Sequence, residues 1–127
     1  MKTFIKLLSV LLVFSLIFGV SSIAYAEESA VPEMIEYGFV DCGDAKVEYG
    51  IYGLADGEPL LLLSPNGGDM HCFDGSILPE MSKHFKVITV STRGTGNSDW
   101  VEGTMNFDVF AEDVLKLLDH LGIAKTN

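Results

Sequence analysis

Hydrophobic and polar positions predict strands in the first half of the chain. Residues 35–41 (IEYGFVD) are rich in β-formers, and residues 46–54 (KVEYGIYGL) alternate in strand fashion. The segment CGDA at 42–45 has turn chemistry, so the two runs predict an antiparallel hairpin. After a further turn at 55–59, residues 60–64 (LLLLS) show no polar alternation. This pattern is typical of a strand that is covered on both faces.

The next part of the chain predicts a helix, a strand and a loop. Residues 73–84 suit a helix with an apolar side, and Pro79 limits or breaks it. Residues 86–91 (KVITVS) predict a β-branched fourth strand. Residues 92–104 form a glycine-rich loop. A helix between two strands already indicates an α/β arrangement.

The clearest helix of the sequence follows this loop. Apolar residues recur at steps of three and four from Phe107 to Leu121, so one face of the helix is apolar. Asn106 or Thr104 can cap its start, and Gly122 stands where a C-terminal glycine belongs. The element order β-β-β-α-β-α predicts an α/β sheet with right-handed crossovers.

The N-terminal segment has the pattern of a targeting sequence. Lys2 and Lys6 precede an uncharged apolar run of about 14 residues, and Ala24-Tyr25-Ala26 supplies small residues at a cleavage site. We expect a signal peptide over 1–26, cleaved after Ala26, and a flexible lead-in over 27–34. An uncleaved anchor is the alternative, but the run is shorter than the roughly 20 residues of a spanning helix. The chain is therefore expected to be secreted or extracytoplasmic, with membrane contact only through this segment.

Charge and cysteine content narrow the classes of function. The formal net charge of −10 argues against a nucleic-acid partner, which requires a basic face. The two cysteines, Cys42 and Cys72, would meet an oxidising compartment after export, where a disulfide is possible.

Two loops are candidate binding segments. Ligands of open α/β sheets bind beyond the carboxyl ends of the strands, and the loops at 64–72 and 92–100 leave two such ends. The first contains glycines that allow backbone amides to approach a ligand. The second (TRGTGNSDW) contains the chain's only arginine, Arg93, which we interpret as a structural clamp on its own loop.

Three pieces of sequence together resemble one known family. PLLLLSPNGGDMH, the RGTGNS loop and AEDVLKLLDHLGI have the order and spacing of the N-terminal half of an α/β-hydrolase-fold protein, over residues 35–127. The resemblance implies an oxyanion loop of the form His-Gly-X after the third strand. The X position is Asn66, whose backbone N–H would contribute a few kcal/mol to stabilising an oxyanion. Pro65 has no N–H to offer.

The chain also departs from this family. Ser64-Pro65 stands in place of His-Gly, and Ser91 stands where the family often has aspartate before its Arg-Gly. The nucleophile elbow G-x-S-x-G is absent, because Ser98 follows the fourth strand and lacks the second glycine. In the family the elbow would come just past Asn127. The resemblance therefore implies an incomplete domain.

This incompleteness shapes the expected function. The chain as given should be inert, whereas its complete form would hydrolyse esters or related small acyl compounds through a Ser-His-Asp triad. The alternative is a degenerate relative without catalysis that serves as a binding or interaction module. A small secreted structural protein is a third possibility that only the bulk composition favours.

The family's strand order, 1-2-4-3-5, has two further implications. The first and third strands would lie about 14 Å apart, whereas a disulfide needs Cα atoms within about 7 Å. We therefore expect Cys42 and Cys72 to be free thiols. Without a fifth strand, residues 60–64 would form an exposed apolar edge through which the chain self-associates.

The remaining polar residues favour structural roles. A loop histidine such as His71 more often serves packing than catalysis, and His84 and His120 stand at expected helix ends, where they interact with the helix dipole. The cluster DMHCFD lacks the second ligand pair of a structural zinc site. RGTGNS lacks the third glycine of a dinucleotide loop. We expect no metal and no cofactor.

Overall fold

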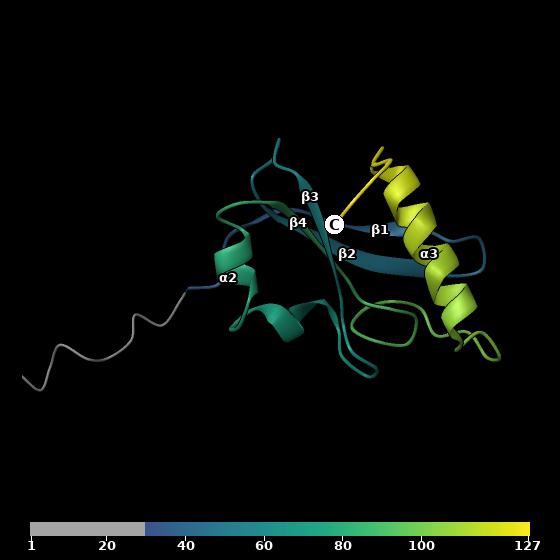
Figure 1. The fold of residues 1–127 in the computed structure, drawn as a ribbon. Helices are drawn as coiled ribbons and strands as arrows, with labels where there is room; N and C mark the ends of the chain where they lie inside the picture. The colour runs from purple at the N-terminus through teal and green to yellow at the C-terminus, as the bar shows by residue number, and fades with distance from the viewer. Residues whose placement is uncertain (1–29) are drawn as a thin grey trace, which may run out of the picture.

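The computed structural model describes residues 30–127, in which four strands form one mixed sheet (Figure 1). The strands are β1 (Met34–Asp41), β2 (Lys46–Gly53), β3 (Pro59–Leu63) and β4 (Lys86–Val90). Their order is β1-β2-β4-β3, and only the β3–β4 pair is parallel. The order confirms what the family resemblance implied for these four strands. The signal peptide predicted at 1–26, with cleavage after Ala26, lies outside the described residues.

The predicted hairpin is confirmed, and its turn is closed by local hydrogen bonds. The N–H of Cys42 donates to the carbonyl of Ala45 at 2.8 Å, and the N–H of Gly43 donates to the Asp41 carboxylate at 2.8 Å. Gly43 has φ 97°, a conformation that L side chains avoid. The turn residues therefore fix the register of β1 on β2.

The connection from β3 to β4 contains two short helices, so the helix predicted over 73–84, which Pro79 was expected to limit or break, is much shorter than its predicted range. The 3₁₀ helix η1 (Met70–Phe73) starts after Asp69, whose carboxylate accepts a hydrogen bond from the N–H of His71. The helix α2 (Leu78–Met81) has Pro79 in its first turn. A proline there costs no helical hydrogen bond, because the first N–H groups of a helix have no partner within it. Pro79 thus starts a helix instead of interrupting one.

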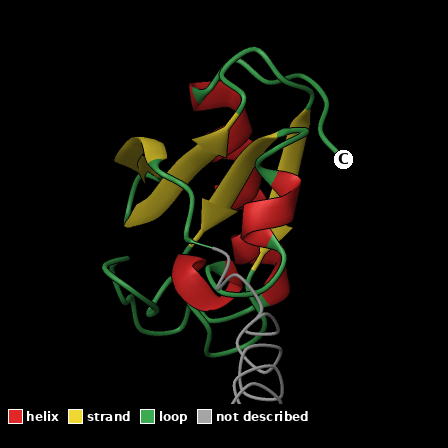
Figure 2. Ribbon diagram, turned by 90° about the vertical axis from the view of Figure 1, so that its left-hand side faces the viewer, coloured by secondary structure: helices red, strands yellow, loops and turns green. Residues whose placement is uncertain are grey.

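The helix α3 (Phe107–His120) agrees with the predicted amphipathic helix. The Asn106 side chain accepts a hydrogen bond from the N–H of Val109 at 3.0 Å, which identifies Asn106 as the cap. Gly122 follows the helix with φ 67°. Leu117 of α3 packs on one face of the sheet, and Leu78 of α2 packs in a second cluster with Tyr52 and Val87. Helices therefore lie on both sides of the sheet (Figure 2).

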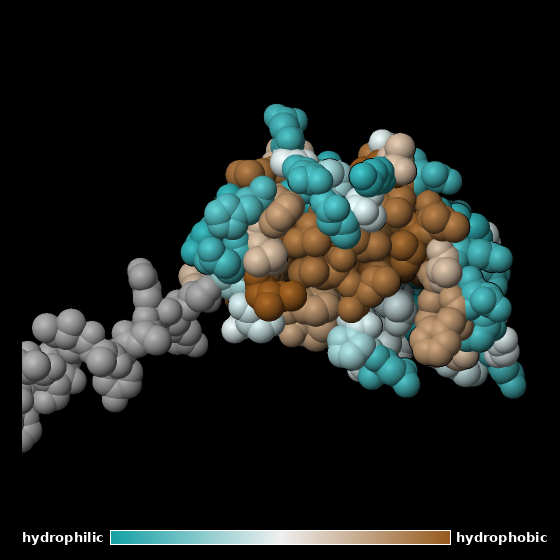
Figure 3. All heavy atoms as spheres, viewed as in Figure 1, coloured by the Kyte–Doolittle hydropathy of each residue, from teal (hydrophilic) through white to brown (hydrophobic). Residues whose placement is uncertain are grey.

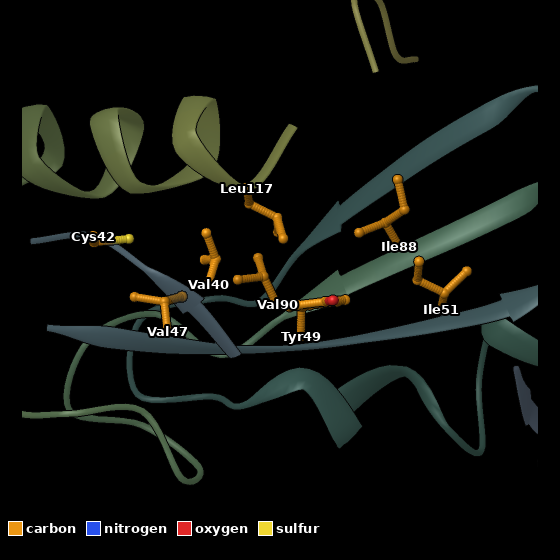
Figure 4. Packing of buried hydrophobic residues seen from close by; sticks show 8 residues of the cluster. All are labelled: Val40, Cys42, Val47, Tyr49, Ile51, Ile88, Val90 and Leu117. Carbon is orange, nitrogen blue, oxygen red and sulfur yellow. The ribbon is translucent and has the colours of Figure 1, made fainter. Parts of the chain in front are cut away.

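The main core lies between α3 and the sheet (Figure 4). Its members come from both hairpin strands, the turn after β1, β4 and α3, and each is at most 3% exposed: Val40, Cys42, Val47, Tyr49, Ile51, Ile88, Val90 and Leu117. Burying one such aliphatic side chain contributes about 1.5–3 kcal/mol. This core holds β4 in the middle of the sheet, and β4 in turn positions β3.

The strand β3 lies at the edge of the sheet and is only partly covered, whereas its sequence pattern predicted full cover on both faces. Leu61 packs against the main core, and Leu60 and Leu62 pack against the second cluster. Leu63 is 54% exposed, and apolar surface gathers over β3 between α2 and α3 (Figure 3). The outer edge of β3 bonds to Asn127: its N–H donates to Pro59 O at 3.1 Å, and its carbonyl accepts from Leu61 N at 3.0 Å. The apolar run is thus a strand whose neighbours among the described residues leave it partly open.

Both cysteines are free thiols, as expected. Cys42 is buried, whereas Cys72 is exposed in η1. Burial raises the pKa of the Cys42 thiol to about 12. No helix between residues 30 and 127 combines the length and apolarity that a membrane crossing requires.

Candidate functional site

A pocket opens where the parallel strands β3 and β4 end. Carboxyl ends of parallel neighbours meet at one edge of a sheet, so the loop at 64–69 lies beside the loop that follows β4. The pocket has a volume of about 510 Å³. Its walls come from these two loops and from the start of α3: Ser64, Asn66, Gly67, Thr92, Gly94, Thr95, Met105, Asn106, Phe107 and Phe110.

Asn66 lies on the wall of this pocket, in an exposed turn. The N–H of Gly68 donates to the carbonyl of Pro65 at 2.8 Å, and Gly67 has φ 81°, which closes the turn. Within residues 30–127 the N–H of Asn66 donates to no protein acceptor. Such a group can donate to the oxygen of a ligand. That Asn66 is an oxyanion donor stays a prediction.

The substituted pair Ser64-Pro65 still holds the start of the loop. The Ser64 hydroxyl donates to the carbonyl of Val90 at 3.4 Å, which ties the loop to the end of β4. Pro65 offers no N–H, but its carbonyl is the acceptor that closes the turn. The loop is therefore anchored without the imidazole that the family resemblance would place here.

Ser91, the other departure from the family, holds the far end of the same loop. Its side chain is fully buried at the end of β4. The hydroxyl accepts a hydrogen bond from the N–H of Met70 at 3.0 Å and donates to Oε2 of Glu48 at 2.8 Å. Ser91 thus connects the loop after β3 to the strand β2.

Glu48 is the residue that sequence reasoning missed. It is 1% exposed, and its carboxylate also accepts hydrogen bonds from the Tyr37 hydroxyl and from both the backbone and the side chain of Asn97. Burial raises the pKa of Glu48, but the hydrogen bonds from Asn97, Tyr37 and Ser91 outweigh it and hold the pKa below its ordinary value. The available signal was a carboxylate between the apolar neighbours Val47 and Tyr49 of a strand.

Arg93 was predicted to clamp its own loop, but it binds carboxylates of two other elements, which corrects the prediction. The guanidinium is 2% exposed and binds both oxygens of Asp113 in α3, at 2.6 and 2.9 Å. It also binds both oxygens of Asp44 in the hairpin turn, at 3.0 and 2.8 Å. These hydrogen bonds raise the pKa of Arg93. The loop after β4 is therefore fixed between the hairpin and α3.

Ser98 has a structural role. Its hydroxyl donates to the carbonyl of Ser91 at 2.6 Å and accepts from the N–H of Glu48 at 2.8 Å, so backbone groups occupy it as donor and acceptor. This geometry agrees with the sequence argument that Ser98 is not a nucleophile.

The three histidines lie apart from the pocket. Nδ1 of His71 is 3.0 Å from the Asp74 carboxylate, and Nε2 of His84 is 3.4 Å from that of Glu80. The ring of His120 packs edge-on against Tyr49. Between residues 30 and 127 no serine shares a hydrogen bond with a histidine, and no group of three His, Cys, Asp or Glu side chains could hold a metal ion.

Known proteins resemble the chain in both sequence and fold. A family model described as "alpha/beta hydrolase fold" matches residues 58–127. A hydrolase from Pseudomonas aeruginosa is 32% identical, with a TM-score of 0.67, over 73% of this chain and 35% of its own. The enol-lactonase from Burkholderia xenovorans is 33% identical, with a TM-score of 0.62, over 72% of this chain and 35% of its own.

A third structure shares the fold at lower identity. A loop variant of a haloalkane dehalogenase from Bradyrhizobium elkanii is 21% identical, with a TM-score of 0.66, over 74% of this chain and 30% of its own. The chain thus spans about a third of the length of these three solved structures. The described residues correspond to an incomplete α/β domain.

Proposed function

Because the chain belongs to the α/β-hydrolase fold family, we propose that it is the N-terminal part of an exported hydrolase. In its complete form this enzyme acts on esters or related small acyl compounds. The 127-residue chain alone is inert, since between residues 30 and 127 no serine shares a hydrogen bond with a histidine. The part it supplies is one side of the site, the oxyanion loop and the pocket beside it.

The observation that carries the proposal is the N–H of Asn66. Asn66 lines the pocket after the carboxyl end of β3, and within residues 30–127 no protein acceptor takes the hydrogen of its N–H. Attack of a nucleophile on an ester carbonyl places negative charge on the carbonyl oxygen, which a preorganised N–H stabilises in the transition state. A donor at this position is what acyl transfer requires.

The apolar lining of the same pocket supports a substrate with a hydrocarbon part. Met105, Phe107 and Phe110 form it, and Phe107 is 87% exposed. The rings of Phe107 and Phe110 meet edge-on with centroids 6.4 Å apart. A backbone donor and apolar side chains around one pocket suit a small acyl compound. Each methylene buried there contributes about 0.8 kcal/mol, or roughly fourfold in kcat/KM.

The test compares the chain with a longer product of the same reading frame. The 127-residue chain should not hydrolyse p-nitrophenyl acetate, whereas a product that includes a G-x-S-x-G elbow should, and should prefer the butyrate ester. Turnover by the 127-residue chain would refute its inertness. A longer product that contains no such elbow and hydrolyses neither ester would favour the alternative, a non-catalytic binding or interaction module.

A matched pair of variants tests the role of Asn66 in the longer product. Asn66→Pro removes the backbone N–H and should lower kcat by about 10²- to 10³-fold. Asn66→Ala keeps the N–H and removes the side chain, so it should retain nearly full activity. Equal activity of the two variants would exclude Asn66 as the oxyanion donor.

Export is tested on the N-terminus of the recovered protein. Mass spectrometry of the extracytoplasmic or secreted fraction should find a chain that begins at Glu27. A chain that retains Lys2 and Lys6 and stays with the membrane would instead indicate an uncleaved anchor.

We further propose that residues 27–127 self-associate through the strand at 60–64. The supporting observation is the part of the outer edge of β3 that Asn127 does not pair with, where the apolar side chain of Leu63 is 54% exposed. Unpaired strand edges tend to pair with other chains. Sedimentation of this segment should reveal oligomers, and Leu63→Lys should shift the distribution toward monomer. A soluble wild-type monomer that unfolds cooperatively would contradict the proposal.

A further inference from the structure

The loop that carries Asn66 ends at a buried anchor. Met70 is fully buried, and its methyl group packs so closely on β2 that a Cβ at Gly50 would lie 2.7 Å from it. The N–H of Met70 donates to the Ser91 hydroxyl at 3.0 Å. Because Met70 lies only four positions after Asn66, this anchor limits where the N–H of Asn66 can lie.

The anchor depends on the direction of one hydroxyl hydrogen. An ionised carboxylate only accepts hydrogen bonds, so Ser91 must donate its hydrogen to Glu48, where the oxygens are 2.8 Å apart. The lone pairs of Ser91 are then left for the N–H of Met70. The charge on Glu48 therefore determines that Ser91 acts as an acceptor toward the loop.

Glu48 is itself held in place from several directions. Its Oε1 accepts from the Tyr37 hydroxyl and from Nδ2 of Asn97, both at 2.7 Å, and its Oε2 also accepts from the N–H of Asn97 at 2.9 Å. Gly96 has φ 53°, and a Cβ there would lie 2.6 Å from the Ser91 hydroxyl. The loop after β4 thus closes tightly over the Glu48–Ser91 pair.

We propose that Glu48 and Ser91 form a positioning pair for the oxyanion loop. The carboxylate of Glu48 reaches from β2 to the end of β4 and orients Ser91, which fixes Met70 and so the turn that contains Asn66. A carboxylate at position 91 could accept the N–H of Met70 directly, and in this chain the pair of residues performs that task from two strands. The inference rests on the proposed function only in giving the loop its purpose.

Amide hydrogen exchange of the full chain, followed by NMR, tests the pair. Glu48→Gln keeps the shape of the side chain and removes its charge. Exchange of the Met70 amide should accelerate about threefold to tenfold relative to the amides of β4, the factor that corresponds to weakening its hydrogen bond to the neutral Ser91 hydroxyl. The amide signals of Asn66 and Gly67 should shift as the turn moves.

Glu36→Gln is the matched control. Glu36 is also a carboxylate of the sheet that accepts a hydrogen bond from a tyrosine hydroxyl, that of Tyr49 at 2.7 Å. It lies on β1 and shares no hydrogen bond with Ser91. This variant should leave the Met70 exchange ratio unchanged.

Relocation of the charge separates positioning from simple destabilisation. In the double variant Glu48→Gln/Ser91→Asp the carboxylate lies at the end of β4, and the new amide can donate to it. The exchange ratio of Met70 should return to the wild-type value. Uniform acceleration across β4 and Met70, an unchanged ratio in Glu48→Gln, or no recovery in the double variant would each overturn the inference.

Failure of this inference and failure of the proposed function can be told apart. If Glu48→Gln does not fold, the variant Ser91→Ala tests the inference instead. It should shift the backbone amide signal of Asn66 and leave the side-chain amide signal of Asn97 unchanged. An unshifted Asn66 signal would overturn the inference. Loss of the inference leaves Asn66 as a candidate donor. An inactive longer product leaves the exchange result standing and removes only the proposed function.

Discussion

Substitution of Arg93 should cost this protein a large part of its stability. The guanidinium is 2% exposed and forms bidentate bonds with two carboxylates that come from the hairpin turn and α3. Its partner Asp113 has a side chain that is 5% exposed, so Arg93→Met would leave a buried carboxylate without its cation. Breaking a buried pair in this way costs about 3–5 kcal/mol. Total stabilities of single domains are only about 5–15 kcal/mol.

The exposure of the two carboxylates predicts unequal effects. Asp44 is 54% exposed, and water can replace the guanidinium there, so Asp44→Asn should cost much less than Asp113→Asn. Lys116→Met is a matched control, because Lys116 also joins α3 to the hairpin, through a 2.7 Å hydrogen bond to the carbonyl of Cys42. Its loss should cost less than about 1 kcal/mol.

Urea unfolding followed by far-ultraviolet circular dichroism measures these differences. Arg93→Met/Asp113→Leu replaces both partners by apolar groups and should recover much of the loss, because two apolar partners leave no buried charge. Equal losses for Asp44→Asn and Asp113→Asn would refute the reasoning. So would a loss below about 1 kcal/mol for Arg93→Met.

Four further outcomes follow from other residues. Leu117→Ala should lower the free energy of unfolding by about 2–5 kcal/mol, because it leaves a cavity at the fully buried contact between α3 and the sheet. Asn106→Ala should lower the free energy of unfolding by about 1 kcal/mol through loss of the α3 cap. Denaturant titration measures both differences. Iodoacetamide at neutral pH should label exposed Cys72 in the folded protein and Cys42 only after unfolding, since burial raises the pKa of Cys42 to about 12. Equal labelling rates of the two cysteines in the folded protein would contradict the burial of Cys42. The folded pKa of Glu48 lies below its ordinary value, so its ionisation stabilises the protein above the unfolded pKa, and this contribution is lost as pH falls through the folded pKa. The stability difference between the wild type and Glu48→Gln should therefore shrink below about pH 4. A stability difference independent of pH would contradict this prediction.

The sequence by itself determined the elements and their order. The hairpin, the LLLL strand and α3 follow from periodicity, turn residues and a cap within a few positions of each other, because such signals act between near neighbours. The helix predicted at 73–84 is shorter than its predicted range for a reason of the same local kind, because Pro79 stands in the first turn of α2 and not in the middle of a longer helix. Periodicity does not single out Asn66; only the resemblance to the motif order of the α/β-hydrolase fold does. The structure places Asn66 on the pocket wall, and its role as a donor stays a prediction.

Only the tertiary structure decided how the site is held. Glu48 and Ser91 lie 43 positions apart, and Arg93 binds carboxylates that lie 49 and 20 positions away. No periodicity links residues at such separations, and Glu48 stands in a strand that is buried on both faces, so alternation assigns it no special position. Its partners come together only when β2 and β4 pair and the loop after β4 folds back over them. Their charge then becomes decisive, because burial removes the water that would otherwise replace each hydrogen bond.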